Sequence, residues 1–423
     1  MFRRFLAATG LANLGDGIAV LAWVWVATTL TRDAGLVALV PVALRLPWVV
    51  FAIPAGLVAD RLDRRRVVIA MDGLRALAFL CAAAALAVQG PLPPAPMQGV
   101  SSAPLFAALC LSALAVGIAE VFRDNAAQAL LPSIVPDAGL ERANGRLWTV
   151  EALANQMIGP ALGAFLLGAA LALPFAVNAV FYAVAALLML RVSGQFRPEA
   201  QTVEGWRPAL MAGVRYLRGQ PLLLLLAVIT GVWNLCFEAV MFAMVLHAQE
   251  NLGLSAQDYG FMLTAFAFGG AAAGLVGDRI AAALGTGRTM QLALLGSAVL
   301  LLAVPLAPNG WLLAACFIVF EMAGITWNIV SVSLRQRLIP DALRGRVNSL
   351  YRLLAWGMIP LGIALSGWVV GVGEPIVGRA QALKLPLWFR WISLCQSPLL
   401  LVELWLAGAS GTAVESNTCR FGK

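Results

Sequence analysis

Long apolar stretches recur along almost the whole chain. Of its 423 residues, 61% are hydrophobic and only 12% are charged, against about 25% charged in an ordinary soluble domain. A helix needs about 20 apolar residues to cross a bilayer. The sequence therefore predicts an all-α integral membrane protein with twelve transmembrane helices. We expect them at residues 5–30, 36–59, 66–88, 104–131, 140–170, 173–190, 220–250, 256–283, 287–306, 311–338, 342–371 and 386–407.

The basic residues indicate how the chain crosses the membrane. The net charge is +8, but the arginines are scattered through the loops instead of forming one face with interleaved aromatics, so nucleic acid is not an expected partner. With the N-terminus in the cytoplasm, most of the 29 Lys and Arg fall in inside loops. The outside loops then hold only Arg32, Arg379, Lys384 and Arg390. Basic loops face the cytoplasm, so both termini are predicted to lie there.

An internal repeat predicts two pseudo-symmetric six-helix bundles. Residues 134–138 and 338–342 both read Pro-Asp-Ala after two aliphatic residues, and Asn13 and Asp16 have counterparts in Asn234 and Glu238. Repeats of this kind are common in transporters. We expect an N-terminal bundle at 1–190, a cytoplasmic linker at 191–219, a C-terminal bundle at 220–408 and a cytoplasmic tail at 409–423. Within the linker, residues 206–218 predict an amphipathic helix along the inner membrane surface.

A charged loop joins the second and third predicted helices and is echoed at residues 274–279. Glycine allows close helix packing, and neighbouring opposite charges at a helix end can pair in one conformation and separate in another. We therefore predict a cytoplasmic gating loop, in which Asp60 and Arg61 latch the inner side. The alternative is that these charges only set topology. The predicted gating residues are Gly56, Asp60, Arg61, Asp63 and Arg64.

Five ionisable residues fall near the middle of predicted helices: Asp16, Arg45, Glu120, Glu238 and Glu321. Each costs about 2.5 to 3.5 kcal/mol to insert, so such groups usually face a cavity or a partner. We expect them to line a central cavity, where the carboxylates carry protons or bind a cationic substrate. The alternative is that they form structural ion pairs with Arg45, Arg123 or Arg352. Arg45 and Arg123 could equally receive an acidic substrate.

A small-residue segment in the fifth predicted helix holds Gly159, Pro160 and Gly163. These residues allow close helix approach and a local bend. We interpret them as a hinge, with ordinary small-residue packing as the alternative.

Taken together, the motifs resemble the major facilitator superfamily over about residues 1–370. The loop at 56–66 resembles the superfamily's signature loop. Residues 13–16, 60–64, 72–75, 127–132 and 159–163 resemble the bacterial branch of macrolide efflux proteins and the enterobactin exporter. The resemblance implies a drug:proton antiporter in the bacterial inner membrane that exports a drug, macrolide or siderophore-like compound. Residues 371–423 depart from the pattern.

Other classes of protein fit the sequence less well. An ATP-driven pump needs a phosphate-binding loop ending in lysine, whereas the lysines are Lys384 and Lys423 and neither follows such a loop. The loops lack the clustered polar site of an enzyme. We expect no cofactor and no metal, because the six cysteines form no close pair. The predicted partners are a small-molecule substrate, protons and the bilayer, for a monomer; uptake by proton symport and a non-transporting sensor are the alternatives.

Overall fold

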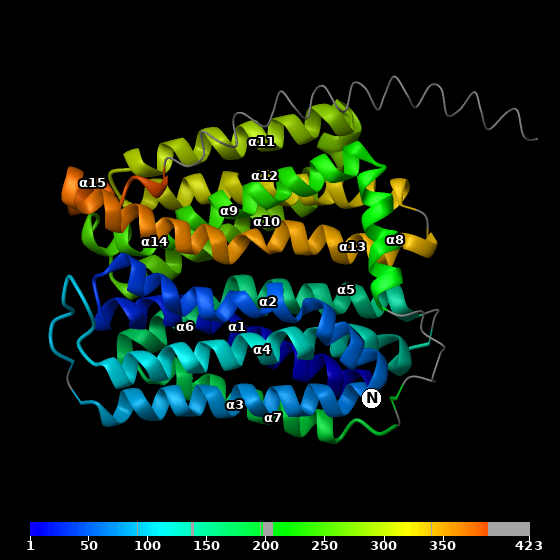
Figure 1. Ribbon diagram of the computed structural model, residues 1–423, viewed down its shortest axis with the longest axis horizontal. Helices are drawn as coiled ribbons and strands as arrows, with labels where there is room; N and C mark the ends of the chain where they lie inside the picture. Colours follow the sequence, from blue (N-terminus) through cyan, green and yellow to red (C-terminus); the bar gives the residue numbers. More distant parts are fainter. Residues whose placement is uncertain (91, 137–138, 195, 198–205, 340, 388–423) are drawn as a thin grey trace, which may run out of the picture.

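The computed structural model describes residues 1–90, 92–136, 139–194, 196–197, 206–339 and 341–387, and the regular secondary structure of this part of the chain is all helical. Its helices form two bundles, one above the other in Figure 1. The first bundle contains α1 (Phe2–Leu30), α2 (Ala34–Arg61), α3 (Arg64–Val88), α4 (Ala103–Ile134), α5 (Leu140–Glu151), the π-helix η2 (Ala152–Ile158), α6 (Gly159–Ala169) and α7 (Leu173–Leu190).

The linker helix α8 (Trp206–Arg218) stands across one end of the second bundle (Figure 1) and leads into it. The second bundle contains α9 (Pro221–Glu250), α10 (Ala256–Leu284), α11 (Thr286–Ala303), the 3-10 turn η3 (Val304–Leu306), α12 (Gly310–Leu338), α13 (Asp341–Trp356), α14 (Met358–Val377) and the short α15 (Arg379–Ala382). Ten of the described helical segments are long and apolar enough to cross a membrane. The predicted twelfth helix, 386–407, lies almost entirely outside the described residues.

Two predicted helices are interrupted in the structure. The one expected at 140–170 contains seven residues of π-helix before Gly159, and the one expected at 342–371 breaks at Gly357 between α13 and α14. In a regular helix the ring of Pro160 would meet the carbonyl four residues earlier, and the wider π-helix carries the chain past it. The break at Gly357 places Pro360 in the first turn of α14, where its missing N–H is harmless.

Side-chain caps fix several of the helix starts. Asp33 accepts from the N–H groups of Gly35 and Leu36 at 2.9 and 3.2 Å. Ser255 and Asp258 form a reciprocal capping box at the start of α10. These side chains satisfy amide groups that a helix leaves without a partner at its N-terminus.

The two bundles repeat the same packing, as the internal repeat predicts. α2 packs on α4 as α10 packs on α12, and α3 packs on α4 as α11 packs on α12. Glycines make equivalent close contacts: Gly117 lies against the carbonyl oxygen of Leu44, and Gly269 against that of Ile318. Any side chain at either glycine would collide with backbone, so the sequence fixes both helix separations.

The bundles meet chiefly through two helix pairs, α6 with α10 and α2 with α14, and also through η2 with α10, α13 with α2 and α1 with α9. At these contacts Gly260 lies against Ala164, and a Cβ at Gly367 would lie 2.8 Å from the carbonyl oxygen of Ala34. Both contacts involve the first turns of α10 or α2. We call the end of the molecule that carries Arg32, Glu250 and Arg379 the clamp end, and the opposite end, which carries Arg64 and Arg335, the basic end.

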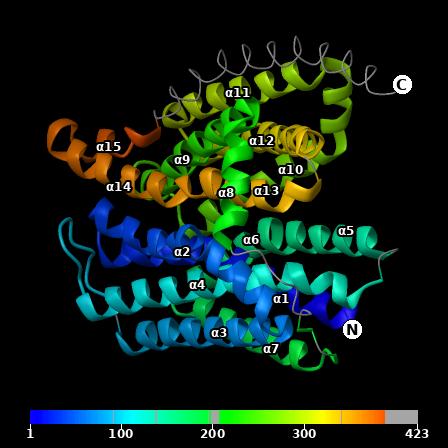
Figure 2. The same ribbon diagram turned by 45° about the vertical axis from the view of Figure 1, so that its right-hand side comes forward.

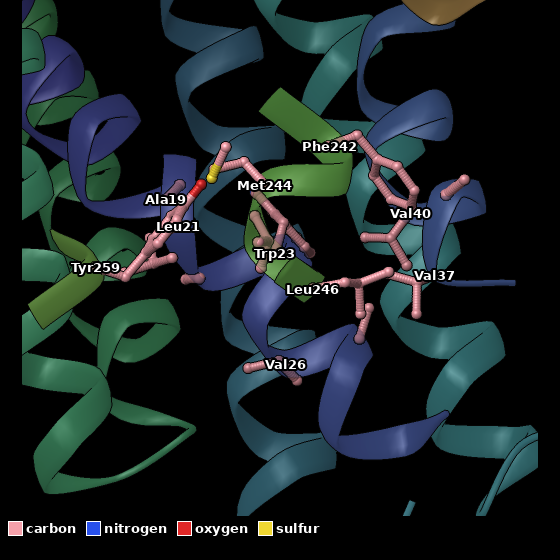
Figure 3. Packing of buried hydrophobic residues seen from close by; sticks show 14 of the residues in the cluster. Ala19, Leu21, Trp23, Val26, Val37, Val40, Phe242, Met244, Leu246 and Tyr259 are labelled. Atoms are coloured by element: carbon pink, nitrogen blue, oxygen red, sulfur yellow. The ribbon is translucent and has the colours of Figure 1, made fainter. Parts of the chain in front are cut away.

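Among the described residues, the apolar core is continuous between the bundles at the clamp end only. There one cluster of buried side chains combines residues from α1, α2, α9 and α10, among them Trp23, Val37, Phe242 and Tyr259 (Figure 3). Toward the basic end each bundle has its own cluster. The structure is therefore closed between the bundles at the clamp end.

Helix α8 forms at the predicted amphipathic segment, and it packs on the second bundle. Leu217 is buried with Leu223, Ile339 and Val347, and the hydroxyl of Tyr216 donates to the carbonyl oxygen of Leu338 at 2.8 Å. Part of the apolar face that the sequence assigns to the membrane surface is thus covered by protein.

Candidate functional site

Asp16 lies at the centre of the buried polar network in the first bundle. Its Oδ1 accepts from the guanidinium of Arg75 on α3 and from the hydroxyl of Tyr182 on α7 at 2.6 Å. The Arg75 guanidinium also lies 4.1 Å from the centroid of the Tyr182 ring, a cation–π contact. Arg75 is fully buried, whereas the Asp16 side chain is 27% exposed. Asp16 thus connects a buried charge with an accessible surface.

The interior behind Asp16 holds further unpaired polar atoms. Nε and Nη1 of Arg75 and both side-chain polar atoms of Asn178 have no partner among the described protein atoms. Asn178 Oδ1 and the Tyr182 ring lie against Gly15, so only glycine fits beside Asp16. Buried polar groups are usually hydrogen-bonded by protein or water, so this side of the site is polar well below its surface.

Arg45 on α2 and Glu120 on α4 form an ion pair at 3.4 Å. The close contact of Gly117 with Leu44 explains the pairing, because it brings the next residue of α2 beside the next turn of α4. Arg45 also interacts electrostatically with Glu238 of the second bundle and with Asp16. The structure therefore brings four of the five predicted cavity residues together.

The charges of this group do not cancel. Asp16, Glu120 and Glu238 supply three carboxylates, against the two guanidiniums of Arg45 and Arg75. With all five ionised, one negative charge is left over in a region of low dielectric constant, where uncompensated charge is costly. One bound proton or one bound monovalent cation is enough to neutralise this charge, so the group does not need both at the same time.

Glu321 lies apart from the group. It is on α12, where its Cβ packs beside Gly269 of α10, and within the described part of the chain we find no ion pair for it. The repeat predicted that Glu321 would lie with the other carboxylates, and in the structure it does not.

Arg123 belongs to a second charged cluster that the sequence did not predict. Its Nε donates to Asp72 and its Nη1 to Asp124, both at 3.3 Å. Arg123 and Asp72 are almost fully buried. Arg123 is therefore already paired and covered, so the expectation that it receives an acidic substrate or pairs with the predicted cavity carboxylates is not met in this structure.

The predicted gating residues make their described contacts within the first bundle. Asp63 caps α3 through the N–H of Arg66 at 3.0 Å and accepts from the N–H of Phe196 at 3.2 Å. Arg64 donates to the carbonyl oxygens of Ala59 and Ala129.

Three further residues complete the predicted gating loop. Arg61 is exposed, and the side chain of Asp60 lies outside the described residues. A Cβ at Gly56 would meet nothing within 4 Å, so the close packing expected there is absent in this conformation. The latch between the bundles stays a prediction.

The predicted hinge lies where the π-helix ends. Pro160 is in the first turn of α6. A Cβ at Gly159 would lie 2.6 Å from the Cα of Gly17, and one at Gly163 would lie 2.5 Å from the carbonyl oxygen of Ile18. Both glycines thus pack on α1 of the same bundle. The structure shows close packing and a π-helix at this segment, and motion about it stays a prediction.

A charged hub joins the two bundles at the clamp end. Arg379 donates to Glu250 through Nε and Nη2 at 2.9 and 3.0 Å, to Glu374 at 2.8 Å, and to the carbonyl oxygen of Arg32 at 2.6 Å. The Arg32 side chain in turn contacts Glu250 at 3.4 Å and Gln249 at 3.0 Å. Two-pronged Arg–carboxylate contacts are among the strongest charged hydrogen bonds. We call this hub the Arg379 clamp.

Arg379 keeps its charge in the physiological pH range. Burial acts to lower the pKa of Arg379, but the hydrogen bonds and charges of Glu250 and Glu374 outweigh it and leave that pKa above its ordinary value. Arginine is charged at neutral pH even without such partners.

The second bundle contains an uncharged pocket between α9, α12 and α13, with a cavity volume of about 80 Å³. Its lining is aromatic and amide-bearing: Thr230, Trp233, Asn234, Gly324, Trp327, Asn328 and Trp356. We call it the tryptophan pocket. The sequence alone does not predict that Trp233, Trp327 and Trp356 converge, because their convergence depends on helix packing.

Comparison with known proteins agrees with this architecture. The chain matches the family model described as transmembrane secretion effector over residues 1–406. The uncharacterized MFS-type transporter YceJ of Bacillus subtilis is 25% identical over 329 residues, 77% of this chain and 78% of that protein. The enterobactin exporter EntS of Shigella boydii is 26% identical over 383 residues, 90% of this chain and 86% of that protein.

The fold is also that of solved transporters. The crystal structure of a bacterial homologue of the iron transporter ferroportin, in an inward-facing state, matches with a TM-score of 0.73 at 16% identity, over 95% of this chain and 98% of that one. The family match spans nearly the whole chain, and the two bundles have the arrangement of these transporters. The chain therefore belongs to the transmembrane secretion effector family, within the major facilitator superfamily of multi-pass membrane transporters.

Proposed function

We propose that this transporter exports a small amphiphilic compound from the bacterial cytoplasm in exchange for protons, by alternating access. The uncompensated negative charge of the Asp16, Arg45, Arg75, Glu120 and Glu238 group carries the proposal. A proton and a cationic group of the substrate would compete to neutralise this charge, and such competition couples their movements. Asp16 is the leading proton carrier, because Arg75 and Tyr182 hold its carboxylate while part of it stays accessible.

Direction and orientation rest on separate observations. The relative named as an exporter supports efflux. The N-terminus, α8 and the α2–α3 turn share the basic end (Figure 1), which supports a cytoplasmic position for that end. The bundles share no core there, so this conformation would be open to the cytoplasm. One chain contains both bundles, which supports a monomer in the inner membrane.

Proteoliposomes test the proposal directly. An inward-directed pH gradient is imposed, and internal pH is recorded while amphiphilic cations, macrolides and siderophores are added. We expect substrate to move protons in the wild type and not in Asp16→Asn, which should still bind substrate. The matched control is Asp258→Asn at the exposed start of α10, where asparagine retains the cap.

Each outcome has a distinct meaning. Proton movement opposite to substrate supports exchange, whereas movement in the same direction supports symport and contradicts export by antiport. Proton movement that survives in both Asp16→Asn and Glu120→Gln would overturn the assigned carriers. Substrate movement without protons would overturn the coupling, and no movement across the panel would support the sensor alternative.

A further inference from the structure

The tryptophan pocket lies one helical turn from the charged group. Asn234 lines the pocket, and Glu238 follows four residues later on the same face of α9. That spacing corresponds to about 6 Å along the helix axis. A single small molecule can therefore contact the pocket and Glu238 together.

The lining selects for an uncharged ligand with hydrogen-bonding groups. None of the residues that line the pocket carries a formal charge, whereas Thr230, Asn234 and Asn328 carry a hydroxyl and two amides. The Asn234 amide is held in place by donating to the carbonyl oxygen of Ala355 at 2.8 Å. The Thr230 hydroxyl lies 2.7 Å from that of Tyr351. Fixed polar groups in an otherwise apolar pocket give orientation and specificity.

One wall of the pocket is flat and rigid. The Trp233 ring stacks on Phe320, with centroids 5.6 Å apart and planes 9° apart, and on Phe237 at 5.1 Å and 17°. Phe237 and Phe320 also stack on each other at 5.3 Å and 8°. Three mutually stacked rings resist reorientation, so Trp233 presents a fixed plane. Such a plane favours an aromatic ligand over a saturated one of the same size.

The opposite wall reaches the other bundle. Trp356, the last residue of α13, packs edge-on against Trp48 of α2, with centroids 5.7 Å apart and planes at 76°. This is a contact between bundles. A ligand on Trp356 therefore touches a side chain whose packing changes whenever α2 and α13 separate.

We propose that the tryptophan pocket binds a planar, uncharged aromatic ring that carries an amide or hydroxyl group. The remainder of the substrate extends along α9 toward Glu238. Identifying the ligand as the transported substrate rests on the proposed function, whereas binding in the pocket does not. The substrate class is thus narrowed from amphiphilic compounds in general to aromatic ones with a neutral polar ring substituent.

Calorimetric titration of the protein in lipid nanodiscs tests the proposal, with empty nanodiscs as the reference. The probe is 2-naphthamide, compared with its saturated decahydro analogue and with charged 2-naphthoate. We expect 2-naphthamide to bind about tenfold more tightly than either. Equal binding of the saturated analogue or of the charged one would overturn the proposal, as would the absence of 2-naphthamide binding up to about 5 mM.

A glycine in the lining offers a matched pair of variants. A Cβ at Gly324 would make ordinary contact with the Trp233 ring at 3.6 Å, whereas one at Gly296 on α11 would meet nothing within 4 Å. Gly324→Val therefore adds methyl groups at the pocket wall. We expect it to weaken 2-naphthamide binding about tenfold and Gly296→Val to leave it unchanged. Wild-type binding by Gly324→Val would overturn the assignment.

The binding experiment also separates this inference from the proposed function. No pH gradient is applied, so a protein that does not exchange protons would still bind 2-naphthamide in the pocket. Conversely, the protein could transport, with protons, a substrate that 2-naphthamide does not displace. That result would support the proposed function and contradict the assignment of the pocket to the substrate.

Discussion

The two bundles share a packing plan but fill it differently. Where α1, α3 and α7 meet in the first bundle, the interior holds the Asp16–Arg75 ion pair, and Arg123 pairs with two aspartates nearby. Where α9, α10 and α12 meet in the second, the described residues form a stack of aromatic rings without an ion pair. The first bundle has stacked rings as well, such as Phe79 on Tyr182, but it combines them with buried charges. Figure 2 shows the bundles as separate layers of comparable size. A repeated scaffold therefore does not require repeated chemistry.

This difference suggests a division of labour. Charged groups in low dielectric respond to protons, whereas stacked rings and amides do not titrate near neutral pH. Changes in the charged group should alter the dependence on pH, and changes in the aromatic stack of the second bundle should alter binding at every pH alike. Each of the following variants tests this contrast.

Arg75→Gln should have the largest effect. It leaves Asp16 without its buried counter-ion, and such losses destabilise by about 3 to 5 kcal/mol. We expect a lower melting temperature in detergent and loss of gradient-driven transport. Arg75→Gln combined with Asp16→Asn should recover part of the stability, because the unpaired charge is gone. The control is Arg288→Gln at an exposed site, and a single variant as stable as this control would contradict the role of the ion pair.

Phe320→Ala should destabilise the second bundle by about 3 to 5 kcal/mol, because it removes the ring that stacks on both Trp233 and Phe237. We expect substrate binding to fall by the same factor at pH 6 and pH 8 in a titration of the purified protein. A pH-dependent loss would break the contrast between the bundles.

Tyr182→Phe should have a smaller and more specific effect. It removes one donor to Asp16 while keeping the ring beneath Arg75 and the stack with Phe79. One hydrogen bond to the carboxylate is lost, so the pH profile of transport should differ from that of the wild type. Tyr216→Phe, which loses a hydrogen bond at the basic end, is the matched control. If Tyr182→Phe and Tyr216→Phe gave identical pH profiles of transport, Tyr182 would have no part in proton coupling.

Arg379→Gln should have the smallest effect, because partly exposed ion pairs contribute little to stability. Opening of the clamp end can be measured as maleimide labelling of Val37→Cys, a fully buried position, in a protein without other cysteines. We expect labelling to be about three to ten times faster than with intact Arg379. Arg288→Gln should not change it, and an unchanged rate in Arg379→Gln would show that the apolar core alone holds this end closed.

Much of the fold could be predicted because helix length and hydrophobicity depend on local sequence. Helices α1 to α4, α7 and α9 to α12 lie close to their predicted ranges. The π-helix before Gly159 carries no local signal that distinguishes it from an ordinary helix. The packing of α8 on the second bundle was not predictable either, because Leu217 contacts Leu223 and Val347, which lie on other helices.

The candidate site was only partly predictable, because pairing depends on which helices touch. An isolated charge in a helix predicts a partner but does not identify it. Asp16 pairs with Arg75, which the sequence showed only as one of several arginines within helices, and Tyr182 and Asn178 gave no signal at all. The expected role of Glu321 came from the repeat, which relates backbones more strictly than it relates side chains.

The two glycine contacts between the bundles have a geometric consequence. Gly260 on Ala164 and Gly367 on Ala34 are two points of near backbone contact, and two fixed points define a line. A rotation of one bundle that preserves both contacts must take that line as its axis, so displacement grows with distance from it. The axis lies toward the clamp end, where the first turns of α2 and α10 take part. The clamp end would thus travel least, and the arc swept by the loops around Arg64 and Arg335 would be the longest in the molecule.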